Sequence, residues 1–294
     1  MPEFLRSGDR VALLAPSGPQ PPEKLDAAVQ SVVDFGLVPE VYDSCRARHG
    51  YLAGSDSLRA ADINRAFADA SVRGVICIRG GYGAHRLMNL IDFDIIRANP
   101  KPLFGYSDIT ALHIAINQLA GVATYHAPMP GTEWYKGLDA FTEAQTRAVL
   151  FGPLPREAAP ATVLSAGSAR GVLTGGNLSL IVSTLGTPYE IDTRGKILFI
   201  EDVDEEPYAI DRMLLHLRDS GKLADCAGIV LGAFTNCVAG KKEPVSLTLG
   251  EIFAELLPAD KPVLSDFQCG HILPTLCLPM GAEVAIENGN FKII

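Results

Sequence analysis

The first third of the chain alternates short apolar runs with longer amphipathic segments, and this alternation constrains the fold more than any other feature. Residues 11–15 and 37–42 are predicted strands, and residues 23–35 between them place apolar side chains at helical spacing. The same order continues with a helix over 57–70 and a strand over 75–78. Successive strands joined by helices form parallel sheets, so we predict a doubly wound α/β domain.

Residues 102–110 (PLFGYSDIT) predict a strand that turns sharply, at Gly105 and Ser107, into a helix. A serine at such a corner exposes its hydroxyl at the sheet edge, and the N–H groups of the following helix point toward whatever it attacks. The usual pattern is G-x-S-x-G, whereas here Asp108 and Ile109 follow the serine. The corner therefore predicts either a nucleophilic Ser107 or a serine that caps the following helix.

A glycine-rich turn, Arg79-Gly-Gly-Tyr-Gly83, directly follows the predicted strand at 75–78. Glycines at a strand-to-helix turn let backbone amides approach a ligand closely. The match to the dinucleotide-binding pattern G-x-G-x-x-G is incomplete, because Arg86 stands where the last glycine should be. The turn is interpreted as a loop of hydrogen-bond donors at the sheet edge that also carries Ser107, or as a plain tight turn.

The second half of the chain is richer in predicted strands, and a change in composition separates it from the first. Residues 151–171 shift toward Pro, Ala and Gly. We therefore predict three parts: an N-terminal α/β domain (1–155), a linker (156–170) and a smaller, β-rich α/β domain (171–294). The chain from Leu278 onward, with Asn288-Gly289 as its turn, predicts a closing hairpin.

Charge and cysteine usage limit the possible partners and compartment. The net charge of −9 and a pI near 5.2 argue against nucleic acid or an anionic membrane surface, and favour a small-molecule or peptide ligand. The first ten residues are charged where a signal peptide would be apolar, and no run reaches transmembrane length, so we expect a cytoplasmic protein. The six cysteines form no CxxC pair and are expected to be reduced and mostly buried.

A nucleophilic serine needs a base within hydrogen-bond reach, and the sequence offers six histidines. His271 is the best candidate, because it follows Gly270 in a loop that also contains Pro274, where an imidazole can be oriented freely. His126 ends a predicted strand and is the next candidate. The others are interpreted as surface or packing residues: His49, His85, His113 and His216.

Glu201 and Asp202 lie at the end of a strand that looks buried. A buried carboxylate is costly unless it is paired, so we expect a functional partner or an ion pair there. The cluster formed with Asp204, Glu205 and Glu206 could also be a solvated acidic loop or a weak cation site, although it lacks the spacing of an EF-hand. The absence of H-E-x-x-H and of zinc-type cysteine spacing disfavours metal-dependent hydrolysis.

Six ordered motifs, spread over nearly the whole chain, resemble those of the LD-carboxypeptidase family of serine peptidases. These are 79–83 (RGGYG), 105–110 (GYSDIT), 175–178 (GGNL), 201–212 (EDVDEEPYAIDR), 270–271 (GH) and 278–281 (LPMG). The resemblance implies an N-terminal domain that bears the serine and a smaller C-terminal domain that bears a glutamate and a histidine.

The resemblance further implies a Ser-Glu-His triad of Ser107, Glu201 and His271, with the N–H groups of Asp108 and Gly81 as the oxyanion hole. Three side chains are candidates for substrate binding: Arg79, Tyr82 and Arg212. The alternative for the two arginines is a structural ion pair with the acidic loop.

The typical family substrate is murein tetrapeptide, from which the terminal D-alanine is released during cytoplasmic peptidoglycan recycling, without a cofactor. Family members are often homodimers. A related branch cleaves microcin-type acyl-sulfamoyl adenylates and uses an aromatic side chain against the nucleobase, a role for which Trp134 is the one tryptophan available here. Two further alternatives are a peptide-binding protein without catalysis and a nucleotide-dependent oxidoreductase that uses Gly81 and Gly83.

Overall fold

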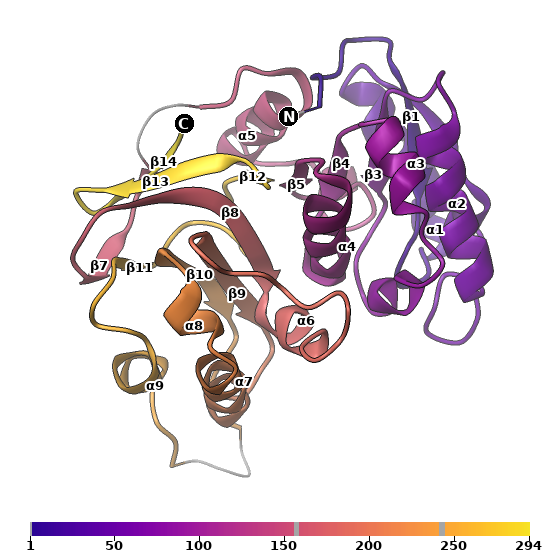
Figure 1. Cartoon of the computed structure of the whole chain (residues 1–294). Helices are drawn as coiled ribbons and strands as arrows, with labels where there is room; N and C mark the ends of the chain where they lie inside the picture. The colour runs from indigo at the N-terminus through magenta and orange to yellow at the C-terminus, as the bar shows by residue number, and fades with distance from the viewer. Residues whose placement is uncertain (1, 156–158, 241–244) are drawn as a thin grey trace. The chain divides into compact units, whose positions relative to one another are not determined.

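The computed structural model of the chain describes residues 2–155, 159–240 and 245–294 (Figure 1). They form two compact units, and neither unit is a single continuous piece of chain. The first unit contains Met1–Leu154 and Leu276–Gly281, and the second contains Pro155–Thr275 and Ala282–Ile294.

The first unit is built on a six-stranded sheet in the order β12-β5-β4-β3-β1-β2. Strands β1 to β5 are parallel, and β12 pairs antiparallel with β5. The parallel strands in the order 2-1-3-4-5 confirm the predicted doubly wound fold. The bounds are β1 (Arg10–Leu14), β2 (Val38–Val41), β3 (Gly74–Cys77), β4 (Leu103–Gly105), β5 (Thr124–His126) and β12 (Leu278–Met280).

The helices of this unit begin where the sequence supplies starting signals. Pro22 is the first residue of the first helix, and the side chains of Ser55 and Asp139 each accept a hydrogen bond from a backbone N–H of the helix that follows. Their apolar faces and the strands form a core that includes Val11, Leu13 and Trp134. The bounds are α1 (Pro22–Asp34), α2 (Asp56–Ala68), α3 (Phe93–Ala98), α4 (Thr110–Ala115) and α5 (Ala140–Phe151).

Both edges of the first sheet contain a proline. Pro39 lies in β2 and Pro279 lies in β12, the two terminal strands of the sheet order. Proline has no N–H to donate to a neighbouring strand, so it is tolerated in edge strands and rare in central ones. The four central strands are completely buried except at Arg10, which explains their continuous apolar sequences.

The second unit is built on an eight-stranded sheet in the order β6-β14-β13-β8-β9-β10-β11-β7. Its centre, β8 to β11, is parallel, and the remaining pairs are antiparallel. The two terminal strands are separated in the chain by Ala161 alone, so the sheet must curl to bring its ends together. The bounds are β6 (Ala159–Pro160), β7 (Thr162–Ser165), β8 (Ala169–Asn177), β9 (Ile197–Val203), β10 (Gly228–Thr235), β11 (Val263–Ser265), β13 (Glu283–Glu287) and β14 (Asn290–Ile293).

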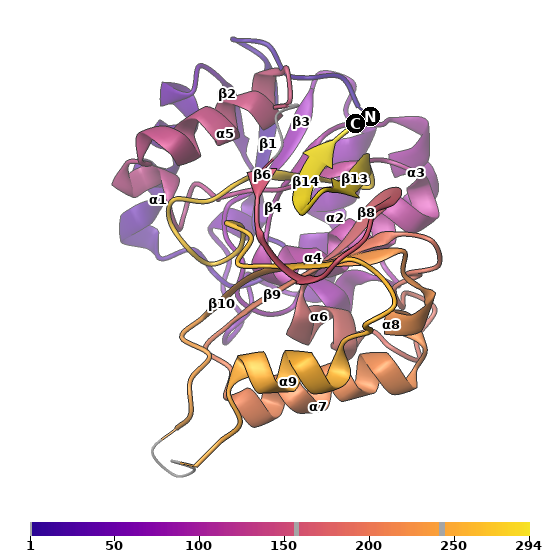
Figure 2. The same ribbon diagram turned by 90° about the vertical axis from the view of Figure 1, so that its left-hand side faces the viewer.

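Two helices of the second unit, α7 and α9, lie side by side (Figure 2). One face of α7 buries Ile210, Leu214 and Leu217, and α9 buries Ile252. The helices of this unit are α6 (Leu178–Ser183), α7 (Pro207–Asp219), α8 (Lys222–Asp225) and α9 (Leu249–Leu256).

The predicted linker over 156–170 is wrong where the structure describes it. Residues 159–160 and 162–165 form β6 and β7, and β8 begins at Ala169, while residues 156–158 lie outside the described residues. The strands β6 and β7 were missed because they have only two and four residues and lie in a stretch whose content of Pro, Ala and Gly also marks linkers.

The predicted closing hairpin begins later than expected. Residues 278–280 pair with β5 of the first unit, so they do not belong to the predicted domain 171–294. The hairpin consists of β13 and β14 alone, and its turn has Asn288 at φ +52° and Gly289 at φ +76°. Positive φ at both central residues is the geometry that favours Asn-Gly.

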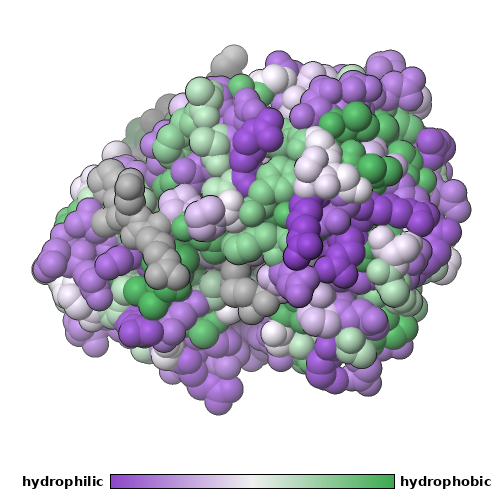
Figure 3. All heavy atoms as spheres, turned by 90° about the horizontal axis from the view of Figure 1, so that it is seen from above, coloured by the Kyte–Doolittle hydropathy of each residue, from purple (hydrophilic) through white to green (hydrophobic). Residues whose placement is uncertain are grey.

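All six cysteines are free and buried, as predicted. Burial raises the pKa of Cys226 and Cys237 to about 11 and that of Cys277 to about 12, so these thiols stay protonated near neutral pH. Hydrophilic residues cover much of the face shown in Figure 3, with hydrophobic residues between them. Within the described ranges, no helix combines the length and the apolar character needed to cross a membrane.

Candidate active site

Ser107 lies at the corner between β4 and a 3-10 turn, Ser107–Ile109, that leads into α4. Its φ of +65° is in the left-handed region, which a residue with a side chain rarely adopts. The capping positions are Tyr106 for the 3-10 turn and Ile109 for α4, and neither side chain caps its helix. Ser107 is therefore not a helix cap, and its corner has the strained conformation expected of a nucleophile elbow.

A buried histidine supports the strand that leads to this corner. His113 Nε2 lies 2.9 Å from the carbonyl oxygen of Gly105, to which it donates, and Nδ1 lies 2.8 Å from Thr124 Oγ1. Burial lowers the pKa of His113 to about 4, so the ring is neutral and Nδ1 accepts from the threonine hydroxyl. His113 thus connects β4, β5 and α4, which agrees with its interpretation as a packing residue.

The glycine turn after β3 passes directly beside Ser107. A Cβ atom on Gly80 would lie 3.1 Å from Ser107 Cβ and 3.2 Å from its Oγ. The carbonyl of Gly80 accepts a hydrogen bond of 3.1 Å from the N–H of Gly18, in the loop after β1. Gly81 has φ +119°, and among the described residues its N–H finds no acceptor, so this amide is available to a ligand.

The guanidinium of Arg79 donates hydrogen bonds to backbone carbonyls of the glycine turn and of the loop after β1. Nη1 donates to the carbonyl of Pro19 at 3.1 Å and Nε to that of Gly80 at 3.3 Å. Arg79 thus connects the loop after β1 to the glycine turn. Tyr82 is 44% exposed and makes edge-to-face contacts with Tyr51 and His85.

In the second unit, Glu201 and His271 are brought together. Glu201 is fully buried at the carboxyl end of β9, and its Oε2 lies 2.7 Å from His271 Nδ1. Burial raises the pKa of Glu201, and the hydrogen bond and charge of His271 act against that rise. A carboxylate that accepts from Nδ1–H fixes the tautomer in which Nε2 is free to take a proton.

Gly270 allows this close pairing. A Cβ atom there would lie 2.9 Å from Glu201 Oε2, and its φ is +127°. The hydroxyl of Thr235 donates to the carbonyl of His271 at 2.9 Å, which holds the loop from the other side. The backbone therefore orients the imidazole together with the carboxylate.

Two family models match the chain: the LD-carboxypeptidase N-terminal domain over residues 11–127 and the LD-carboxypeptidase C-terminal domain over residues 170–286. The chain belongs to the LD-carboxypeptidase family. A probable murein peptide carboxypeptidase of Bacillus subtilis is 46% identical, over 97% of this chain and 91% of its own length. The microcin C7 self-immunity protein of Escherichia coli is 27% identical, over 83% of this chain and 79% of its own.

A solved structure, the muramoyltetrapeptide carboxypeptidase of Oxalobacter formigenes, has a TM-score of 0.86 and 28% identity and covers 97% of both chains. These similarities make the protein a serine LD-carboxypeptidase with a general carboxypeptidase role. The two-domain α/β architecture expected from the motifs is confirmed.

The acidic cluster of this LD-carboxypeptidase has structural partners. Asp202 is buried and accepts hydrogen bonds from Asn177 Nδ2 and from the N–H and hydroxyl of Ser179. Asp204 accepts from Asn236 Nδ2. Across the parts of the chain that the structure describes, no group of three or more acidic, histidine or cysteine side chains could hold a metal ion.

The remaining candidates of the LD-carboxypeptidase are an exposed arginine, four histidines of differing burial and a buried tryptophan. Arg212 is exposed on α7, with its guanidinium 5.8 Å from the ring centroid of Tyr208. His49 and His216 are exposed, His85 is partly buried, and His126 is buried with its ring 5.4 Å from that of Tyr106. Trp134 is buried against Phe35, so it serves the core of the first unit.

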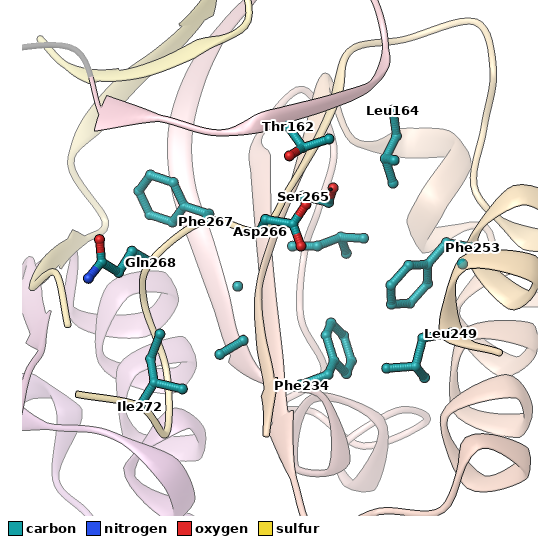
Figure 4. Close-up of a pocket in the computed structure, with 14 residues that line it drawn as sticks. Thr162, Leu164, Phe234, Leu249, Phe253, Ser265, Asp266, Phe267, Gln268 and Ile272 are labelled. Atoms are coloured by element: carbon teal, nitrogen blue, oxygen red, sulfur yellow. Dashed lines mark hydrogen bonds between the residues drawn. The ribbon is translucent and has the colours of Figure 1, made fainter. Parts of the chain in front are cut away.

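A pocket of about 630 Å³ in the second unit of the LD-carboxypeptidase includes Ile272, the residue after His271. Figure 4 shows Leu249 and Phe253 of α9 projecting toward Phe234 of β10, with which Phe253 forms a ring pair at 5.1 Å. Asp266 supplies a carboxyl group to an otherwise mostly apolar lining. Sequence patterns did not indicate this pocket, because its walls come from residues far apart in the chain.

Proposed function

We propose that Ser107, His271 and Glu201 form the catalytic triad of this enzyme, and that it releases the terminal D-alanine from murein tetrapeptide. The observation that carries the proposal is the 2.7 Å hydrogen bond between His271 Nδ1 and the fully buried Glu201, two residues that the sequence motifs already paired. The strained φ of +65° at Ser107 supports the nucleophile. For these three residues to act as a triad, His271 Nε2 must come within hydrogen-bond reach of the Ser107 hydroxyl.

In the proposed reaction, Ser107 Oγ attacks the carbonyl carbon of the bond that precedes D-alanine, and His271 Nε2 takes the hydroxyl proton. His271 then gives this proton to the departing amine, which leaves an acyl-enzyme that water hydrolyses by the same steps. Glu201 stabilises the imidazolium that forms twice in each cycle. The oxyanion would be bound by the N–H groups of Gly81 and Asp108, and losing one such donor costs about 3 kcal/mol in the transition state.

We infer that side chains of both units take part in substrate recognition. Tyr82 is exposed and directly follows Gly81. Arg79 lies in the same turn, but its guanidinium already donates to backbone oxygens, so it suits holding the turn in shape better than binding a substrate carboxylate. Arg212 is a candidate because it is exposed on the helix that follows Glu201 and Asp202. We also propose a cytoplasmic homodimer, with the free, buried cysteines favouring a reducing compartment.

The test is the release of D-alanine from purified murein tetrapeptide by the wild type and by Ser107→Ala. We expect release by the wild type and a loss of at least 1,000-fold in the variant, because the nucleophile is gone. A tetrapeptide that ends in L-alanine serves as the control and should not be cleaved. A reagent specific for active-site serines should label the wild type and leave Ser107→Ala unlabelled.

Failure of this test has defined consequences. If the folded wild type releases no D-alanine but cleaves an acyl-sulfamoyl adenylate, hydrolysis of the adenylate takes the place of the murein reaction as the proposed function. If both substrates fail and Ser107 is not labelled, the chain is a binding protein. Cell fractionation and sedimentation equilibrium test the compartment and the dimer.

A further inference from the structure

A buried arginine on α2, Arg59, contacts both the glycine turn that lies beside Ser107 and the loop after β1. Its side chain is 1% exposed, which is rare for an arginine. Nη1 donates to the carbonyl of Gly83, at the end of the glycine turn, at 2.9 Å, and also to the carbonyl of Pro16, in the loop after β1. One guanidinium nitrogen therefore connects two loops at the carboxyl edge of the first sheet.

The charge of Arg59 is balanced at the surface end of the side chain. Nη2 pairs with Asp56 one turn earlier on α2, and Asp56 in turn accepts a bidentate pair from Arg86 at 2.8 to 3.1 Å. A bidentate arginine–carboxylate pair has a fixed geometry. Arg86 follows the glycine turn by three residues, so the ion pairs connect α2 to the turn a second time.

The residue after the nucleophile is attached to the same turn. The carboxylate of Asp108 is buried, and its Oδ2 accepts a 2.7 Å hydrogen bond from the N–H of Ala84, directly after Gly83. Asp108 also interacts electrostatically with Arg59. The elbow and the glycine turn are thus connected on one side by Asp108, while Gly80 lies against Ser107 on the other.

We propose that Arg59 is a positioning residue, which fixes the glycine turn relative to the elbow so that the N–H of Gly81 is held where the oxyanion forms at Ser107. A buried guanidinium is expensive to desolvate, and an apolar side chain would pack a helix against a sheet at lower cost. Among the described residues, the hydrogen bonds of Arg59 go to the two loops and to Asp56, whose other partner, Arg86, borders the turn. The inference rests on the proposed role of Ser107 and Gly81.

Arg59→Met, Arg59→Lys and Arg59→Ala test the proposal, with D-alanine release as the assay and a melting curve for each variant. We expect Arg59→Met to lower kcat by about 100-fold with KM changed by less than about 3-fold, the pattern of a lost transition-state interaction. Arg59→Lys keeps the charge but cannot reproduce the planar fork, so we expect a smaller loss of about 10-fold in kcat. Arg73→Met is the matched control, because Arg73 is an exposed arginine that pairs with Glu3.

A second measurement separates positioning from stability. Free guanidinium ion at a non-denaturing concentration should raise kcat of Arg59→Ala at least 5-fold and leave Ser107→Ala inactive. If Arg59→Met is unfolded at the assay temperature, the kcat of Arg59→Lys and the guanidinium rescue of Arg59→Ala test the positioning role instead.

Wild-type kcat in the folded Arg59→Met variant would overturn the inference, as would wild-type kcat in Arg59→Lys together with no rescue of Arg59→Ala. These results are distinct from a failure of the proposed function. That failure would appear as no D-alanine release by the wild type or as release by Ser107→Ala, whereas an active wild type and an inactive Ser107→Ala with fully active Arg59 variants would refute the role of Arg59 alone.

Discussion

A methyl group at Gly80 would contact Ser107 so closely that one of the two residues would have to shift. Gly80 has an ordinary backbone conformation, so alanine can be accommodated by the chain, but its Cβ would press on Ser107 Cβ and Oγ at 3.1 and 3.2 Å. We predict that Gly80→Ala lowers kcat for D-alanine release by about 100-fold, the loss typical of a small displacement of a reacting group. Steady-state kinetics and a melting curve measure the two effects separately.

The matched control for this prediction is Gly250→Ala. A Cβ atom at Gly250 on α9 has Thr248 Oγ1, at 3.9 Å, as its nearest neighbour. Its activity should equal that of the wild type. Full activity in Gly80→Ala would show that the turn can move away from Ser107, and would remove the argument for a rigid site.

His113 gives the enzyme a pH-dependent stability. In the unfolded chain the ring binds a proton below its ordinary pKa of 6.5, whereas in the folded state burial holds the pKa at about 4. The unfolded state therefore binds more protons between these values, and the free energy of unfolding falls as the pH drops from 6.5 to 4, by at most about 3 kcal/mol.

Urea unfolding of the wild type and of His113→Gln at pH 7.5, 6 and 5 checks this prediction. The variant cannot titrate at this position, so its stability should decline less over the same range. Equal declines in both proteins would mean that the buried ring does not contribute.

Residues with a local signature were predictable, and residues that act through distant contacts were not. Ser107 was indicated by a strand-to-helix corner, and the pairing of Glu201 with His271 followed from motifs 70 positions apart. Arg59 lies in a helix whose sequence gives no sign that its guanidinium is buried. Its partners, the carbonyls of Pro16 and Gly83, are backbone groups that carry no sequence signal at all.

At the scale of elements, the helix α9 begins with a reciprocal pair of capping hydrogen bonds. Thr248 Oγ1 accepts from the N–H of Glu251, and the Glu251 carboxylate accepts from the N–H of Thr248, which together form a capping box. We predict that Thr248→Ala lowers the free energy of unfolding by about 1 kcal/mol.

The urea midpoint of Thr248→Ala measures this loss, with Ser246→Ala as the control. Ser246 is exposed and, within the part of the chain that the structure describes, its hydroxyl bonds only the carbonyl of the adjacent Leu247, so its removal should leave the midpoint unchanged. An unchanged midpoint in Thr248→Ala would mean that α9 frays without affecting the global transition.

Central elements followed from the sequence more readily than peripheral ones. The strand β3 is buried along its whole length and β1 is buried except at Arg10, and continuous apolar runs in the sequence indicate this burial. The strand β7 is exposed along most of its length, and β12 contains a proline, so neither has the pattern of a strand. Both exist because a partner strand from a distant part of the chain pairs with them.

At the scale of the whole molecule, the end of the chain contributes to both units. Residues 276–281 supply β12 to the first sheet, and residues 282–294 supply β13 and β14 to the second. We predict that a chain ending at Thr275 is destabilised in both units, because each sheet loses a strand and the buried side chains upon it, among them Met280 and Ile286.

Thermal unfolding followed by circular dichroism tests this prediction, with a chain that lacks only the exposed Ile294 as the control. The control should melt as the full chain does, and the shortened chain should melt earlier or not cooperatively. An unaltered transition in the chain ending at Thr275 would show that β12, β13 and β14 add nothing to stability. This exchange of strands between the units could not be predicted from composition. Composition indicates a domain boundary only where the types of residue change along the chain.

The ends of the two sheets determine how readily copies of this protein join into aggregates. An open strand edge presents unpaired N–H and C=O groups to which another chain can add a strand. The first sheet ends in two strands that each contain a proline, Pro39 and Pro279, and the second ends in strands that Ala161 holds next to each other. The folded enzyme should therefore resist growth by strand addition, and copies that associate should do so through side-chain surfaces.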